Sequence, residues 1–156
     1  MSSVTKSIDV NVPVSTAYNQ WTQFELFPQF MEGVKEVHQI DDKRLHWRAE
    51  VGGKTQEWDA RITQQIPDQR IAWTSVSGDM NGGAVDFHRI SDNQTRISLT
   101  LDYDPKGFLE SVGDALGFMN REVESDLKRF KQFIESRGSE TGGWRGTVEE
   151  RPDTTL

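Results

Sequence analysis

The stretch from Leu45 to Tyr103 alternates apolar and polar residues and is interrupted by short turn sequences at near-regular spacing. A period of two is typical of antiparallel strands that bury one face. The turns fall at 41–42, 52–53, 67–68, 78–83 and 92–93, where Gly, Pro, Asp and Asn are concentrated. From Val34 onward, the pattern therefore predicts a meander of six strands. Its inward positions are Leu45, Trp47, Ala49, Val51, Trp58, Ala60, Ile62, Ile71, Trp73, Val85, Phe87, Ile97, Leu99, Leu101 and Tyr103.

Three shorter elements are predicted ahead of the meander. Val4–Val12 alternates like a strand, and Pro13 then ends the strand and favours the start of a helix. Apolar residues at helical spacing predict a helix over Val14–Phe24. A short second helical piece is predicted around Pro28, closed by Gly33.

A long helix is predicted after the meander, from Phe108 to Arg137, with Gly138 as its stop. We therefore expect a single α+β domain over residues 1–138. Its seven-stranded curved antiparallel sheet would wrap around the C-terminal helix. Residues 139–156 are polar and Gly-rich, which predicts a mobile tail apart from Trp144. Within it, the stretch 142–146 favours a loosely docked tail slightly over a flexible interaction tag.

Composition excludes several classes of function. The formal charge of -7 disfavours non-specific binding to nucleic acid or anionic lipid, and the chain has no cysteine. The three histidines lack the spacing of metal ligands, and no apolar run is long enough to span a membrane. We expect a cytoplasmic bacterial protein without metal or cofactor, while the sequence predicts no oligomeric state.

One helix is too narrow to fill the concave face of a strongly curved sheet with close-packed side chains. Either the two N-terminal helical pieces fill the remaining space, or a cavity stays open beside the long helix. Gly113 and Gly117 lie one turn apart in the predicted helix. They favour close approach of helix and sheet slightly over a second interpretation, in which missing side chains leave room for a guest.

The order of these elements closely resembles the polyketide cyclase/dehydrase-like branch of the START/Bet v 1-like (SRPBCC) superfamily. The resemblance covers Val4 to Arg137, and its most specific segment is Phe27-Pro28-x-Phe30-Met31. It implies a helix-grip fold with two short helices after the first strand and a cavity between the sheet and the last helix. The superfamily includes lipid and hormone carriers, aromatase/cyclases and quinone-binding proteins. No catalytic motif of the cyclases matches residue by residue.

The predicted inner face suits an apolar guest better than acid/base chemistry. An ordinary aromatic core is at least as good an interpretation for any single residue. Tyr103 is a weak catalytic candidate, since its hydroxyl would donate either to a ligand or to a backbone oxygen. Outward residues such as His46 and Asp59, and the charges of the long helix, are expected to be solvated. The predicted ligand-binding residues are Trp47, Trp58, Trp73, Phe87, Tyr103, Phe30, Met31, Leu116, Met119 and Val123.

Our leading hypothesis is a binding protein for a hydrophobic ring-containing or acyl molecule, such as a lipid, polyketide or quinone-like compound. The ligand would enter near 78–83 and 105–108. The first alternative is an aromatase/cyclase or dehydratase acting on a polyketide chain, with Tyr103 as proton donor. The second is an interaction protein that uses Trp144 or the segment Phe27–Met31.

Overall fold

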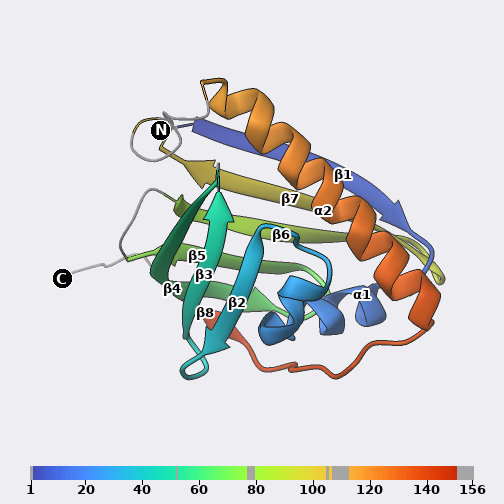
Figure 1. Ribbon diagram of the computed structural model, residues 1–156. Coiled ribbons are helices and arrows are strands. Elements are labelled where there is room, and N and C mark those ends of the chain that lie inside the picture. The colour runs from blue at the N-terminus through green and yellow to red at the C-terminus, as the bar shows by residue number, and fades with distance from the viewer. Residues whose placement is uncertain (1, 52, 77–79, 105, 107–112, 151–156) are drawn as a thin grey trace.

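The structure, a computed structural model, describes residues 2–51, 53–76, 80–104, 106 and 113–150 (Figure 1). A curled antiparallel sheet partly encloses the long helix α2, which runs diagonally across its concave side (Figure 1). The elements are β1 (Ser2–Val10), α1 (Val14–Trp21), the 3-10 helix η1 (Phe24–Gln29), β2 (Val34–Gln39), β3 (Arg44–Val51), β4 (Lys54–Ile66), β5 (Arg70–Ser75), β6 (Met80–Ser91), β7 (Gln94–Tyr103), α2 (Ala115–Arg137) and β8 (Val148–Glu149).

The strand order confirms the predicted seven-stranded helix-grip sheet. The order is β1-β7-β6-β5-β4-β3-β2, so β1 joins the far end of the meander. Each neighbouring pair is antiparallel, as short hairpin turns require. A further two-residue strand, β8, pairs with β4 outside this order and was not predicted.

The helices begin and end close to the predicted positions, with local corrections. Helix α1 ends at Trp21, before the predicted end at Phe24, because a separate 3-10 turn begins there and accommodates Pro28. Helix α2 ends as predicted, with Gly138 in the left-handed conformation at φ 75°. Its start is capped by Asp114, and the predicted start at Phe108 lies outside the described residues.

Neither interpretation of the two glycines was correct. Gly113 precedes α2 and has φ of 82°, a conformation that residues with a side chain rarely adopt. The backbone N–H of Gly117 donates to Asp114 Oδ1 at 3.0 Å. A Cβ atom on Gly117 would lie 2.2 Å from Asp114 Oδ2. Gly117 therefore makes room for the helix cap, and not for the sheet or for a guest.

An aromatic cluster fills the end of the interior beside α1. The Trp21 ring lies 5.3 Å from Phe27, 5.4 Å from Phe30 and 5.0 Å from Phe130, measured between centroids. All four side chains are at most 1% exposed. The N-terminal helical pieces thus pack against α2 at this end of the interior, as one of the two predicted arrangements proposed.

The predicted mobility of the tail is wrong for residues 139–150, which we call the C-terminal segment. This segment runs from the end of α2 past α1 to the edge of β4 (Figure 1). Gln20 is fully buried, and its side-chain amide exchanges two hydrogen bonds with Thr141, at 3.1 and 2.9 Å. The Trp144 backbone N–H donates to Thr22 Oγ1 at 3.0 Å. Because a buried amide needs hydrogen-bond partners, Gln20 fixes the segment in place.

Candidate functional site

A cavity of about 100 Å³ lies between the concave face of the sheet and the N-terminal half of α2. Strands β3 to β7 supply one wall, α2 supplies the other, and the turn between η1 and β2 closes one side. The alternation along each strand places large apolar side chains on this face. The lining residues are Met31, Gly33, Val34, Trp47, Ala49, Glu50, Val51, Trp58, Trp73, Ser75, Gly82, Leu99, Leu101, Phe118, Met119, Glu122 and Asp126.

Three tryptophans from adjacent strands form the sheet wall. Trp47 on β3 is the register partner of Trp58 on β4, and their rings stack at 5.9 Å with an interplanar angle of 6°. The ring of Trp73 on β5 also stacks with Trp47, with 6.2 Å between the ring centroids and an interplanar angle of 24°. Because the three rings pack against one another, they occupy much of the space that the curved sheet encloses. An engineered cavity of roughly 150 Å³ takes up benzene, so the remaining space matches a single ring in scale.

The structure brings together half of the ten residues predicted to bind a ligand. Met31, Trp47, Trp58, Trp73 and Met119 line the cavity. The other five do not line it. Phe30, Phe87, Tyr103 and Val123 are buried in the core, and Leu116 is 53% exposed on the outer side of α2.

The predicted entrance is only partly described. Residues 77–79, 105 and 107–112, which include half of the expected entry region, lie outside the described residues. Gly82, at the edge of that region, lines the cavity.

Two acidic side chains of α2, Glu122 and Asp126, also line the cavity. The expectation that all charges of this helix are solvated is therefore wrong. The Asp126 side chain is only 14% exposed. A signal was present in the sequence: Met119, Glu122 and Asp126 follow one another at spacings of three and four, which places them on one face of a helix.

Asp126 lies in an environment that favours its neutral form. Burial, together with the nearby charge of Glu122, raises the pKa of this carboxyl to about 7. Arg129 Nη1 lies 3.2 Å from Asp126 Oδ1 and favours the ionised form. The same guanidinium also contacts Glu32 Oε2 at 2.5 Å, so its charge is shared. Desolvation therefore outweighs this ion pair.

Two polar atoms of the sheet wall are buried without a hydrogen-bond partner in the part of the chain that the structure describes. They are Trp47 Nε1 and Ser75 Oγ, and Trp47 as a whole is only 5% exposed. Both residues line the cavity. Each atom has less than 1 Å² of accessible surface, so these two groups lie inside the wall and are not presented to the cavity.

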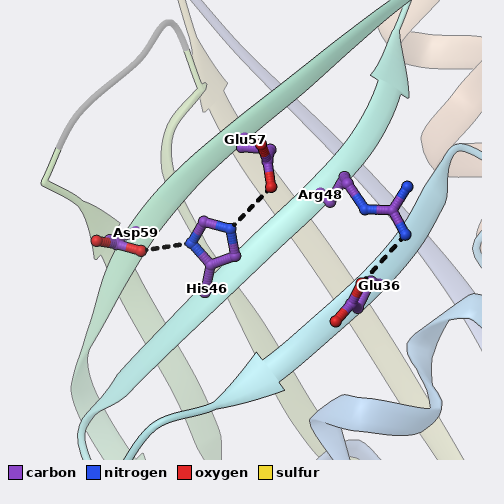
Figure 2. A network of polar contacts seen from close by, with 5 residues as sticks. All are labelled: Glu36, His46, Arg48, Glu57 and Asp59. Atoms are coloured by element: carbon purple, nitrogen blue, oxygen red, sulfur yellow. Dashed lines mark hydrogen bonds and ion pairs between the residues drawn. The ribbon is translucent and has the colours of Figure 1, made fainter.

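The outer face of the sheet carries the predicted cross-strand ion pairs (Figure 2). His46 Nδ1 lies 2.6 Å from Asp59 Oδ1, and its Nε2 lies 3.2 Å from Glu57 Oε1. Arg48 pairs with Glu36 at 3.1 Å. Hydrogen bonds to Asp59 and then Glu57 raise the pKa of His46. This network faces away from the tryptophans and is separate from the cavity.

Other kinds of site find no support in the described residues. No group of three or more His, Cys, Asp or Glu side chains there is placed to hold a metal ion. Within the same part of the chain, no helix has the length and apolar character needed to cross a membrane.

Comparison with known proteins shows which family this chain belongs to. A sequence model described as "Polyketide cyclase / dehydrase and lipid transport" matches residues 10–132. An uncharacterized 17.2 kDa protein from the melC2-rnhH intergenic region of Streptomyces lincolnensis is 56% identical over 149 residues, which is 95% of this chain and 99% of that protein.

Two solved structures share the fold at low identity. The Zhui aromatase/cyclase from a Streptomyces species has a TM-score of 0.74 and 15% identity, over 92% of this chain and 99% of that one. A START superfamily protein from Mycobacterium smegmatis has a TM-score of 0.73 and 16% identity, over 86% and 98% of the two chains.

Proposed function

The chain belongs to the polyketide cyclase / dehydrase and lipid transport family, and from that premise we propose that it binds a hydrophobic, ring-containing small molecule in the cavity beside α2. The observation that carries the proposal is the stacked wall of Trp47, Trp58 and Trp73 around an open space of about 100 Å³. Pockets that bind small molecules are mostly apolar, with a few polar groups that fix orientation. This cavity has that character, since its polar side chains are confined to a few positions.

The size of the cavity argues for a compact guest. Typical sites for drug-sized molecules measure about 300–1,000 Å³, well above the space found here. The open space of about 100 Å³ is smaller than the cavity of roughly 150 Å³ that takes up benzene, so a single small ring is the guest nearest to it in scale, and a polycyclic guest requires the tryptophans to move. We therefore place single-ring compounds first and acyl chains second.

Native mass spectrometry of the freshly purified protein tests the proposal directly, because a retained guest adds its mass to the folded chain. Isothermal titration with single-ring, acyl and quinone compounds then measures affinity. Ala49 lines the cavity and is 3% exposed, so Ala49→Leu places three extra carbons in the open space and should abolish binding. Ala115→Leu is the matched control, since Ala115 lies on α2 outside the cavity wall. Absence of a bound mass and of any titration signal across all three panels would contradict the proposal.

Asp126 favours one second candidate, an aromatase/cyclase or dehydratase activity on a polyketide chain. A general acid or base works best when its pKa lies near the operating pH, and the pKa of Asp126 is about 7 at the cavity wall. Tyr103 does not line the cavity, which places it outside reach of a guest there. With a poly-β-keto thioester as substrate, Asp126→Asn should lower turnover by about 10²–10⁴-fold, while Tyr103→Phe retains it. Equal turnover in Asp126→Asn and the unmodified protein would remove this candidate.

A further inference from the structure

We propose that the cavity admits ring compounds with an uncharged substituent and rejects those that carry a carboxylate. This inference rests on the proposed function and specifies the chemical class of its ligand. It follows from the two carboxyl groups that α2 places at the cavity wall.

The charged side chains at the cavity wall are acidic. Glu122 and Asp126 of α2 line the cavity, whereas Glu50 borders it from an exposed position of β3, and no Lys, Arg or His is among the described lining residues. A Cβ on Gly33, also in the wall, would lie 3.6 Å from Glu122 Oε2, so this carboxylate borders the side that the glycine leaves open. Like charges in a site of low dielectric constant repel strongly. An anionic guest therefore meets repulsion without a lining cation to offset it.

The nearest cation does not change this balance. Arg129 contacts the Asp126 carboxylate at 3.2 Å but does not line the cavity. It is already shared between Asp126 and Glu32. The raised pKa of Asp126 agrees with this geometry, because it records that negative charge is disfavoured at the same place.

The sheet wall offers no counter-charge. Its polar side-chain atoms Trp47 Nε1 and Ser75 Oγ each have less than 1 Å² of accessible surface, so they are not presented to a guest. A hydroxyl group stays uncharged in the apolar site and can donate its proton to a carboxylate on the helix wall. A carboxylate on the guest cannot donate a hydrogen bond and loses its hydration on entering. An uncharged substituent therefore suits this cavity and a carboxylate does not.

Two compounds with the same ring separate these cases: benzyl alcohol and benzoate. Isothermal titration of the full chain at pH 8 measures each, with Asp126 largely ionised because its pKa is about 7. We expect the benzoate to bind at least about tenfold more weakly than the alcohol. In Glu122→Gln, benzoate affinity should rise by about fivefold or more, with little change for the alcohol.

Glu124→Gln is the matched control, since it removes one charge from α2 at a residue outside the cavity that pairs with Lys128 at 3.1 Å. It should leave both affinities unchanged, and thermal unfolding confirms that each variant is folded. Benzoate that binds as tightly as the alcohol, or more tightly, would overturn the selectivity while the proposed function stands. If neither compound binds and wider ring and acyl panels also fail, the proposed function itself falls, and this inference with it.

Discussion

At the scale of single residues, Asp126 predicts how stability depends on pH. Its folded pKa of about 7 lies above the ordinary value of 3.8, so the folded state binds the proton more tightly than the unfolded state. Stability from this group is therefore greatest at low pH and falls as pH rises from about 4 to 7, by at most about 4 kcal/mol. Asp126→Asn should be more stable than the unmodified protein at pH 8 and should lose most of that advantage at pH 4. Urea unfolding at both pH values checks this, and an equal difference at the two would contradict it.

His46 should also make the protein less stable as pH rises, for a different reason. Its pKa is raised by the carboxylates of Asp59 and Glu57, so its contribution is fully present below the ordinary value of 6.5 and is lost as pH rises through the folded pKa. The side chain is 38% exposed, which limits the effect to about 1 kcal/mol or less. His46→Gln should thus be slightly less stable at pH 5.5 and indistinguishable at pH 9. Urea unfolding at both pH values measures the difference, and an equal effect of the substitution at the two would contradict this prediction.

At the scale of elements, the C-terminal segment belongs to the fold and is not an appendage. Val148 is 7% exposed and pairs with Gln65 of β4, while Arg145 bridges to Asp68 at 2.8 Å. Truncation after Gly138 should lower the free energy of unfolding by about 2–4 kcal/mol, since it exposes buried apolar surface and leaves Gln20 without its partner. Thr141→Ala removes one partner of that amide and should cost about 1 kcal/mol. Urea unfolding measures both, and a truncated chain as stable as the full chain would contradict the assignment.

The elements themselves were predictable to unequal degrees. The strands were predicted because alternation over several residues fixes which side faces inward, as with Trp47, Ala49 and Val51 on β3. Strand β8 has two residues in a Gly-rich stretch, too few to show a period. Its position depends on contacts with α1 and β4, which are distant in sequence. Glu122 and Asp126 were missed because charges beside an apolar helical stripe usually face solvent, and only the tertiary position of α2 turns this pair inward.

At the scale of the whole molecule, the interior has one closely packed end and one end that contains the cavity. The sequence predicted that a single helix cannot fill the curved sheet, and it left open whether the N-terminal helices or a cavity would occupy the rest. Both outcomes occur: the Trp21 cluster fills one end, and the cavity remains at the other. The volume of about 100 Å³ was not predictable, because it depends on how three tryptophan rings stack, and period-two patterning contains no information on side-chain rotamers.

This division predicts opposite responses to changes of volume at the two ends. Phe30 is 1% exposed and packs its ring against Trp21 and Phe130, so Phe30→Ala should cost about 3–5 kcal/mol through the space that it opens. Ala49→Leu adds volume where space already exists, so its cost should stay below about 1.5 kcal/mol. Urea unfolding of both variants compares them. A cost for Ala49→Leu as large as that for Phe30→Ala would mean that the cavity wall cannot accept even three additional carbon atoms, and a wall so rigid could not admit a ring.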